Sequence, residues 1–334
     1  MVATIKDVAR KAGVSVATVS RAFNNAESVS EETLTLVQQV ARDIRYFPNA
    51  AGRSLSMQKT DAIGLLLPDL FGEFFSEVIR GSDQVVQENH FHLLVSSSHS
   101  TREEIEAALK VMRARIDGLI VMSPHIDARA LNENLPHTLP VVLLNCHVED
   151  DLFDSVNIDN FGGAFQMVQH LLGHGRRRIA IIKGKEQNFD AAERLRGYRA
   201  CIEHEHAERN SALELDGNFS EASGYDAVKR ALNIHPRPTA IFASNDSMAI
   251  GALSALHEVG VRVPDEIALA GFDDIPVARY LSPALTSVHF GIDDLGALGV
   301  KTVFHAIREK NRHRKQRVML PTTLTVRESC GCKQ

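Results

Sequence analysis

The fold of the N-terminal part of the chain is decided by residues 4–24, TIKDVARKAGVSVATVSRAFN. Thr4 can cap a first helix, whose apolar residues recur every three or four positions until Gly13 ends it. Ser15 can then cap a second short helix over residues 16–23. Two short helices joined by a three- or four-residue turn that contains glycine have the spacing of a helix-turn-helix.

A third helix is predicted after residue 30. Ser30 can cap it, and two acidic residues follow in its first turn, where the helix dipole is positive. Its apolar stripe is formed by Leu34, Val37, Ala41 and Ile44. This stripe would cover the inward side chains of the second helix, Val19 and Phe23, and so complete a small three-helix core.

The second helix would leave one face free for a partner. The side chains on that face are small apart from one arginine: Val16, Ala17, Thr18, Ser20 and Arg21. In a major groove, Arg21 could donate two hydrogen bonds to a guanine, and Val16 or Ala17 could contact a thymine methyl group. From these residues alone, a plain helical hairpin is the alternative to a DNA-reading motif.

The charge of the chain is unevenly placed. The whole chain of 334 residues has a formal net charge of -5, but residues 1–60 hold eight Lys and Arg against five Asp and Glu, which makes this part +3. The rest of the chain is therefore -8. A basic head on an acidic body concentrates the affinity for phosphate in one place, which favours nucleic-acid binding by the head.

Four motifs of the head, residues 4–9, 13–15, 18–21 and 23–24, resemble in order and spacing the DNA-binding domain of the LacI/GalR family of bacterial repressors. The resemblance continues through residues 46–55, YFPNAAGRSL, although Gly52 stands where an alanine is expected. In the family this stretch is a hinge helix that folds on operator DNA, and its leucine, here Leu55, wedges into the minor groove. The resemblance implies the following DNA-contacting residues: Thr4, Ser15, Val16, Ala17, Thr18, Ser20, Arg21, Asn24 and Leu55.

Beyond residue 60, strand-like apolar runs alternate with amphipathic helical stretches. Strands are predicted over residues 62–67, 92–97, 118–122, 141–144, 155–158, 179–182, 240–243 and 267–271, with helices such as 74–89, 103–115, 191–203 and 248–259 between them. This alternation predicts parallel sheets with helices on both faces, and the length favours two sheets. Ligands of open α/β sheets bind at the carboxyl ends of the strands, so the expected site is a cleft between two lobes.

The resemblance to the LacI/GalR family extends over this whole body. It implies an effector domain similar to periplasmic sugar-binding proteins, with two lobes, three crossover strands and a ligand in the cleft. The expected fold is a small all-α helix-turn-helix head plus an α/β effector domain of two doubly wound parallel-sheet lobes. The expected domains are 1–48 (head), 49–60 (hinge helix and linker) and 61–334 (effector binding and dimerisation), with lobe 1 at about 61–160 and 291–322 and lobe 2 at about 161–290 and 323–334.

Ten residues become effector-binding candidates by their position in this resemblance: Asp69, Phe74, Phe75, Asn145, Asn188, Asp190, Arg194, Phe219, Asn245 and Asp273. Carboxylates and a guanidinium suit the hydroxyl groups of a sugar, and a flat aromatic ring suits its apolar face. Simpler interpretations exist for some of them. Arg194 could be a structural ion pair and Asp273 a turn cap, and Phe75 and Phe219 could belong to the core.

Two positions depart from the family pattern. Met122 stands where some sugar-binding members have a polar residue after the third strand. Lys185 stands where small residues or proline are more usual. Lys185 would suit an anionic ligand such as a sugar phosphate or a uronate, although a solvated surface lysine is the simpler interpretation.

Composition and spacing argue against several other classes. No apolar run reaches the ~18 residues of a membrane span, and the first residues hold no apolar signal-peptide region, so a cytoplasmic protein is expected. The four cysteines do not resemble a disulfide framework. The fifteen histidines form no ligand pattern, and Cys330 and Cys332 have no Cys or His at ligand spacing, so neither a metal nor a cofactor is predicted.

Together these features predict a sequence-specific DNA-binding transcription regulator, most simply a repressor. Because one short helix reads few base pairs, a homodimer on a pseudo-palindromic operator is expected. A small ligand, a sugar or sugar derivative, would bind between the lobes and change the operator affinity allosterically. The alternative for the body is a solute-binding protein of a sugar transporter, and an enzyme is disfavoured because no nucleophile–base pair has a recognisable spacing.

Overall fold

The structure of the chain is a computed structural model, and it describes residues 3–24, 28–46, 59–98, 101–123, 126, 128–146, 152–205 and 213–332. The chain divides into two compact units, Met1–Thr60 and Asp61–Gln334. Most of the expected hinge, with Gly52 and Leu55, lies outside the described residues. No helix in the described ranges is long and apolar enough to cross a bilayer.

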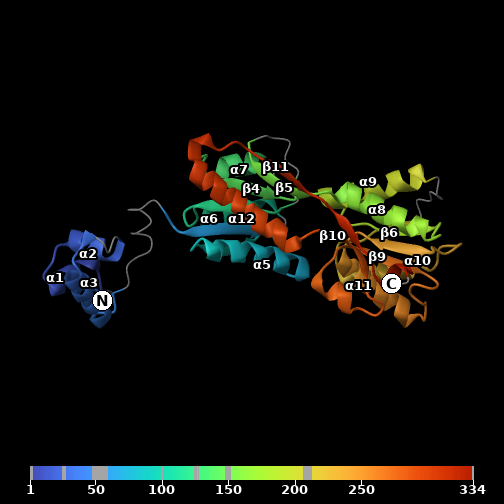
Figure 1. The fold of residues 1–334 in the computed structure, drawn as a ribbon, viewed down its shortest axis with the longest axis horizontal. Helices are drawn as coiled ribbons and strands as arrows, with labels where there is room; N and C mark the ends of the chain where they lie inside the picture. Colours follow the sequence, from blue (N-terminus) through green and yellow to red (C-terminus); the bar gives the residue numbers. More distant parts are fainter. Residues whose placement is uncertain are drawn as a thin grey trace. The chain divides into compact units, whose positions relative to one another are not determined.

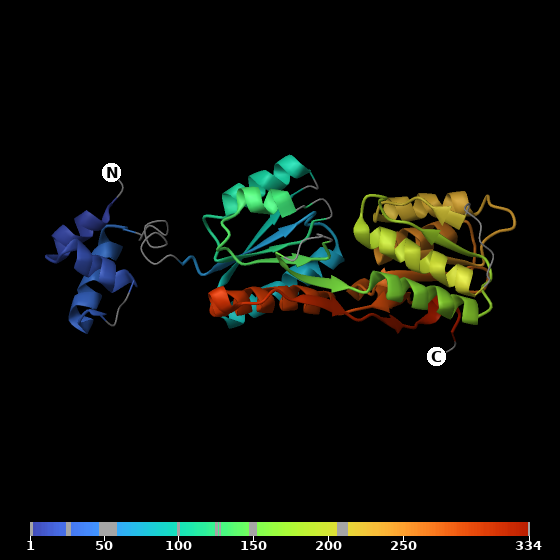
Figure 2. The same ribbon diagram turned by 90° about the horizontal axis from the view of Figure 1, so that it is seen from above.

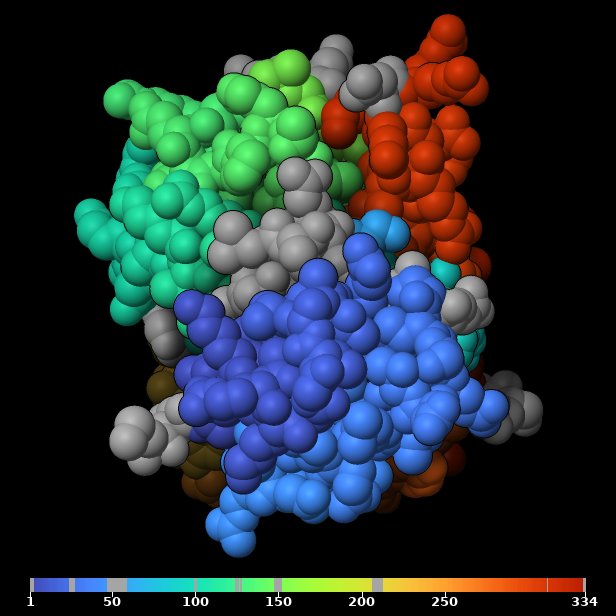
Figure 3. All heavy atoms as spheres, turned by 90° about the vertical axis from the view of Figure 1, so that its left-hand side faces the viewer, coloured from blue at the N-terminus to red at the C-terminus, as the bar shows by residue number. Residues whose placement is uncertain are grey.

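The first unit contains the three predicted helices, α1 (Ile5–Ala12), α2 (Val16–Asn24) and α3 (Glu31–Asp43) (Figure 1). Val8, Val19 and Val37 form the centre of its core, and the exposed fraction of each is 0%. The helices therefore meet through the apolar stripes that the sequence predicts. Figure 3 shows one face of this unit as a compact body of side chains, drawn in blue.

Short polar side chains and one glycine set the ends of these helices. The Ser15 hydroxyl oxygen accepts the backbone N–H of Thr18, and Ser30 accepts that of Thr33, as expected for caps. Gly13 ends α1 with a φ of 68°, a left-handed conformation that glycine adopts without strain. The turn between α1 and α2 is thus the one that the helix-turn-helix spacing requires.

In the part of the chain that the structure describes, the second unit contains two six-stranded sheets, and each forms one lobe. The first sheet is wholly parallel, with the order β11-β5-β4-β3-β1-β2. Its strands are β1 (Ala62–Leu67), β2 (His92–Ser97), β3 (Gly118–Val121), β4 (Val141–Leu144), β5 (Asp154–Ile158) and β11 (Arg317–Leu320). Figure 2 shows the helices on its two faces, which are α5 (Glu73–Glu88) and α12 (Ile292–Glu309) on one and α6 (Arg102–Met112) and α7 (Ala128–Asn134) on the other.

The second sheet has the order β12-β10-β9-β8-β6-β7. Its strands are β6 (Ile179–Ile182), β7 (Glu214–Leu215), β8 (Ala240–Ala243), β9 (Ala268–Asp273), β10 (Thr286–His289) and β12 (Thr323–Thr325). The helices on its two faces are α8 (Asn160–Gly173) and α9 (Phe189–His204) on one and α10 (Glu221–Ala231) and α11 (Asp246–Glu258) on the other (Figure 1). The pair β10–β12 is antiparallel and the other pairs of this sheet are parallel, so the predicted parallel-sheet lobe is confirmed, with one antiparallel edge strand.

The chain passes between the lobes three times within the described residues, after β5, after β10 and after β11. The first and third passages enter the second lobe, whereas β10 leaves it, which is why β12 runs antiparallel to β10. The passages also bond to one another: the Asp159 N–H donates to the Leu320 carbonyl (3.1 Å), and the Thr322 hydroxyl donates to the Asp159 carbonyl (3.4 Å). Only a few residues therefore separate the lobes, and these are where the lobes can rotate.

The strand bounds agree with the apolar runs in most places. β1, β2, β4, β6 and β8 have the predicted bounds, and β3 ends one residue early. β9 runs on to Asp273, so this carboxylate belongs to the last residue of a strand and does not follow the strand as predicted. The apolar pattern does not predict β7, β10, β11 or β12.

The C-terminal cysteines lie next to two histidines that the sequence spacing does not reveal. His170 lies in the last turn of α8, and His174 follows the helix directly. Cys330 Sγ lies 3.4 Å from His170 Nε2, and Cys332 Sγ lies 3.0 Å from His174 Nε2. Because about 160 residues separate the histidines from the cysteines, sequence spacing cannot reveal that they meet.

Candidate functional site

A cleft of about 780 Å³ lies between the lobes, and all ten effector-binding candidates line it. Four of them come from the first lobe: Asp69, Phe74, Phe75 and Asn145. The other six come from the second lobe: Asn188, Asp190, Arg194, Phe219, Asn245 and Asp273. They meet because most of them stand at the carboxyl ends of strands or in the helices that follow, and the volume is that of a small-molecule site.

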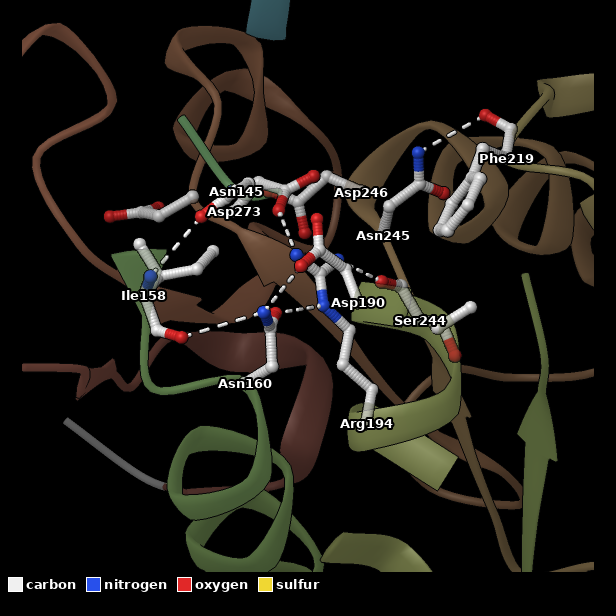
Figure 4. A network of polar contacts seen from close by, with 12 residues as sticks. Asn145, Ile158, Asn160, Asp190, Arg194, Phe219, Ser244, Asn245, Asp246 and Asp273 are labelled. Atoms are coloured by element: carbon white, nitrogen blue, oxygen red, sulfur yellow. Dashed lines mark hydrogen bonds and ion pairs between the residues drawn. The ribbon is translucent and has the colours of Figure 1, made fainter. Parts of the chain in front are cut away.

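Arg194 is the centre of the polar wall of this cleft, and its exposed fraction is only 4%. Its Nε donates to Asn160 Oδ1 (2.7 Å), and its Nη1 donates to the backbone oxygen of Ser244 (Figure 4). Its Nη2 lies 3.3 Å from Asp273 Oδ1, and its guanidinium carbon lies 3.7 Å from the centre of the Phe272 ring. Arg194 is therefore a buried structural ion pair and a lining group of the cleft at the same time.

Two carboxyl groups of the wall have raised pKa values. Burial is the main cause for both, and the positive charge of Arg194 opposes it. Burial raises the pKa of Asp190 to about 6, although this carboxylate also accepts a hydrogen bond from Asn160 Nδ2 (2.8 Å). Burial raises the pKa of Asp273 to about 7, with the negative charge of Asp190 as a further cause. A ligand hydroxyl that donates to either group would favour its ionised form.

One oxygen of Asp273 is committed to Arg194. Its Oδ1 is inaccessible to solvent and lies 3.3 Å from Arg194 Nη2, and among the described residues it has no other donor. Contact with a ligand in the cleft therefore falls to the rest of this carboxylate.

Asp246, which is not among the predicted site residues, is buried next to Asp273. Its side chain is fully buried, with Oδ2 accepting the N–H of Ile275 (2.9 Å) and Oδ1 accepting the hydroxyl of Ser287 (2.6 Å). Burial raises the pKa of Asp246 well above its usual range, and the charge of Asp273 adds to this. The turn after β9 is thus held by Asp246, whereas Asp273 remains available to the cleft.

The three candidate asparagines of the cleft each use their side-chain oxygen on the backbone. Asn188 and Asn245 cap α9 and α11, and Asn145 accepts the N–H of Ile158 (3.1 Å). Asn245 also donates to the carbonyl of Phe219 (3.1 Å), so both ends of its amide are bonded. Among the described residues, the side-chain nitrogens of Asn145 and Asn188 have no further acceptor, and they can donate to a ligand.

Aromatic rings form the apolar part of the lining. Phe74 and Phe75 are half-buried and stand nearly perpendicular, with ring centres 5.3 Å apart. Phe219, with a φ of 72°, lies against Gly184, where any side chain would overlap the ring. Phe75 and Phe219 also pack on the core, so the core interpretation and the cleft interpretation both hold for their positions.

The two positions that depart from the family pattern also line the cleft. Met122 is buried, with 5% exposed, and Lys185 is exposed. Glu186, exposed next to Lys185, lines the cleft as well. The positive charge of Lys185 is therefore accompanied by a negative one, which weakens the case for an anionic ligand.

Sequence reasoning missed two residues that organise the cleft. Asn160 bridges Asp190 and Arg194, and its position just after β5 is a signal that could have identified it. Glu73 Oε2 accepts the N–H of Val277 (3.0 Å) and so joins α5 of the first lobe to η3 (Pro276–Tyr280) of the second. No local pattern distinguishes Glu73 from other acids in a first helical turn.

The head presents the predicted face of α2. Val16 is 41% exposed, and Ala17 and Arg21 are exposed beside it. Thr18 and Ser20 are half-buried at the edge of this face. A short apolar patch with one guanidinium has the size and chemistry that a major groove accepts.

The remaining DNA-contact candidates differ in their positions. Thr4 and Ser15 stand at the starts of α1 and α2, where the Thr4 hydroxyl donates to Asp7 Oδ2 (2.7 Å) and Ser15 serves as a cap. Asn24 is the last residue of α2, and its side chain is not among the described atoms. Leu55 lies outside the described residues.

Residues 4–49 match the model of the bacterial regulatory proteins of the lacI family, and residues 168–330 match that of the periplasmic binding protein-like domain. The ribose operon repressor of Escherichia coli (strain K12) is 33% identical over 330 residues, which cover 98% of this chain and 99% of that protein. The chain belongs to the lacI family of bacterial regulatory proteins. This lacI-family regulator is a DNA-binding repressor controlled by a small ligand.

Solved structures are similar to the lacI-family regulator over almost its whole length. The lac repressor dimer bound to operator and the anti-inducer ONPF has a TM-score of 0.84 at 26% identity, with 99% of each chain covered. A complex of the transcriptional regulator CelR with cellobiose has a TM-score of 0.74 at 30% identity, covering 98% of this chain and 99% of that one. The helix-turn-helix head and the two-lobed body of the regulator are thus those of its family.

Proposed function

We propose that the cleft of this lacI-family repressor binds a neutral carbohydrate, and that the bound sugar changes the affinity of a homodimer for a pseudo-palindromic operator. The observation that carries the proposal is the group Asp190–Asn160–Arg194–Asp273, which presents charged and amide groups next to half-buried phenylalanine rings. Sugars combine hydroxyl groups with an apolar ring face, and this wall is complementary to both.

Three roles follow for the side chains of the cleft. Asp273, whose carboxylate lines the cleft, accepts hydrogen bonds from sugar hydroxyls, and Arg194 donates to sugar oxygens. Phe219 covers the apolar face of the ring. Solved relatives with cellobiose and with ribose are consistent with ligands of this class.

In the head, we propose that Arg21 reads a base and that Val16 and Ala17 contact thymine methyl groups. Their exposure on one face of α2 supports this role. Leu55 is proposed as the residue that opens a base step in the minor groove, on the strength of its place in the 46–55 motif. A transporter's solute-binding protein would have no use for such a head, and we propose no turnover of the ligand.

Direct binding measurements on the purified protein test the carbohydrate proposal. A panel of aldoses, disaccharides, sugar phosphates and uronates is screened by thermal shift, and hits are measured by calorimetry. We expect a neutral sugar among the hits, and at least about 100-fold weaker binding in the Asp273→Asn and Phe219→Ala variants, because a site built for hydroxyl groups depends on its charged acceptor.

Asp226→Asn is the matched control, because Asp226 is exposed on α10 of the second lobe and lies outside the lining of the cleft. This variant should bind the sugar like the wild type. Selective binding of sugar phosphates or uronates, lost in Lys185→Ala, would replace the neutral ligand by an anionic one. Binding that is unchanged in Asp273→Asn would contradict the proposed site.

A further inference from the structure

Four potential metal ligands meet at the end of α8, away from the cleft. His170 and His174 are one helical turn apart and so lie on the same side of α8. Cys330 and Cys332 come from the C-terminal segment, which lies beside this end of α8 in Figures 1 and 2. We call these four residues the His2Cys2 cluster.

The spacing of the ligand atoms fits a tetrahedral metal ion. Zinc lies about 2.3 Å from thiolate sulfur and about 2.0–2.1 Å from imidazole nitrogen, which in a tetrahedron places sulfur and nitrogen roughly 3.6 Å apart. Cys330 Sγ and Cys332 Sγ lie 3.4 and 3.6 Å from His170 Nε2, and Cys332 Sγ lies 3.0 Å from His174 Nε2. The ligand atoms of His170, Cys330 and Cys332 are all within 4.8 Å of one another.

The backbone holds both cysteines toward the helix. The neighbour of Cys330, Ser329, is fully buried, and its hydroxyl donates to the Leu269 carbonyl (2.6 Å) while its oxygen accepts the N–H of Thr286 (2.8 Å). Gly331 separates the two cysteines with a φ of 95°, a left-handed conformation that few other residues adopt. The C-terminal segment is therefore anchored to the second sheet, and its tight turn brings both thiols to one side.

The cluster is accessible, and it is separate from the effector site. Cys330 is buried, His170 and Cys332 are half-buried, and His174 is exposed, so an ion can enter from solvent. Asn160, which belongs to the cleft, stands at the other end of α8. At about 1.5 Å per residue, the two ends of this 14-residue helix are about 20 Å apart.

We propose that His170, Cys330 and Cys332 bind one Zn²⁺ ion, and that His174, which lies beside Cys332, completes a closed, four-coordinate site. Two thiolates and two imidazoles are a ligand set typical of structural zinc, and they leave no position for a substrate. Both thiols release their protons on binding. The ion would tie the C-terminal segment to α8 and so stabilise the second lobe.

Cobalt titration of the full-length protein tests the site. The protein is reduced with a phosphine, freed of metal with a chelator, and titrated with Co²⁺ under anaerobic conditions. We expect one Co²⁺ per chain, with a thiolate-to-cobalt charge-transfer band and the strong visible bands of a tetrahedral ion. Zn²⁺ should displace the cobalt, and saturating Zn²⁺ should raise the melting temperature of the chain.

Single-ligand variants locate the ion. Cys332→Ser and His174→Asn change partly exposed positions, so the fold should persist, and each should weaken Co²⁺ binding more than about tenfold, with the double variant losing the charge-transfer band. His257→Asn is the matched control, because His257 is also exposed in the last turn of a helix of the same lobe. This control should bind Co²⁺ like the wild type.

Three results would overturn the proposal. The first is Co²⁺ or Zn²⁺ uptake without a thiolate band. The second is uptake that the double variant retains, which would place the ion elsewhere. The third is a fully reduced wild-type protein that takes up neither ion but forms an intramolecular Cys330–Cys332 disulfide on oxidation, seen as a mass lower by two hydrogens.

Discussion

Arg194 and Asp273 form an ion pair with side-chain exposures of 4% and 6%. Removing two charges from water costs free energy that their mutual attraction repays only in part, so a buried pair is weak evidence for stability alone. Here both partners line a cleft between the lobes, where a ligand can reach them. The arrangement is better explained as a binding site whose charges are held ready for a ligand.

The raised pKa values of Asp190 and Asp273 make effector binding depend on pH. Because sugar hydroxyls donate to the ionised carboxylates, binding favours loss of a proton and should strengthen as pH rises through about 6 and about 7. With a pKa of about 7 in the free protein, we expect about tenfold tighter binding at pH 8 than at pH 6. Calorimetry at a series of pH values, in two buffers of different ionisation enthalpy, measures both the affinity and the released proton.

The Asp226→Asn variant should keep this pH profile, since Asp226 lies outside the lining of the cleft. A sugar that binds equally well at both pH values, or better at pH 6, would contradict the account.

The same pKa shifts have the opposite effect on the stability of the chain without ligand: stability should fall, not rise, with increasing pH. The folded chain holds protons that the unfolded chain has lost, so the free energy of unfolding should fall as pH rises from about 4 through about 7.

Among the elements, four of the five strands with the predicted bounds are buried throughout, and β2 is the exception. β1, β4, β6 and β8 are unbroken apolar runs, and such runs can be recognised in a sequence without knowledge of the strands that pair with them. In β11 exposed and half-buried residues alternate, β12 has one exposed and two half-buried residues, and the two strands contain arginine and threonine. They are strands only because the crossovers place them at sheet edges, which is a property of the topology.

For the cleft residues as well, what could be predicted was what depends on local sequence and not on distant contacts. Residues that stand at strand ends were predictable from position, as Asn145, directly after β4, shows. Asn160 and Asp246 were not predicted as site residues, because their importance lies in hydrogen bonds to residues at least 29 positions away. The His2Cys2 cluster was missed for the same reason, over a still longer separation.

The packing of α10 on α11 gives a test at the scale of elements. A side chain at Gly251 would overlap the carbonyl oxygen of Glu221, and one at Gly224 would overlap that of Met248, so the two backbones touch through these glycines. Gly251→Ala must push the helices apart and should lower the free energy of unfolding by about 1–3 kcal/mol. Urea denaturation without added metal measures the change.

Gly173→Ala is the matched control, since a methyl group there meets no atom within 4 Å and the residue is helical. It should change the free energy of unfolding by less than about 0.5 kcal/mol. Equal stability of the Gly251→Ala and wild-type proteins would show that the two helices can separate at no cost, contrary to the packing described.

At the scale of the whole molecule, the geometry of the body suggests how a ligand acts at a distance. The two lobes share three short passages, which bond to one another through Asp159, Leu320 and Thr322. Glu73 also links the lobes across the cleft edge by its bond to Val277. A ligand that contacts both lobes must favour one of their relative orientations, and only such a difference in affinity between states can be transmitted to the head.

The measurement that tests this coupling most directly is operator binding, by fluorescence anisotropy, with and without the sugar identified by calorimetry. DNA from the protein's own promoter region serves as the operator. The Arg21→Ala variant should bind this DNA at least about tenfold more weakly, which would show that the anisotropy signal reports recognition by α2. We predict that the sugar shifts the operator Kd of the wild type at least about tenfold, about 1.4 kcal/mol of coupling. Asp273→Asn should bind the operator normally but show no shift. An operator affinity that the bound sugar leaves unchanged in the wild type would contradict the account.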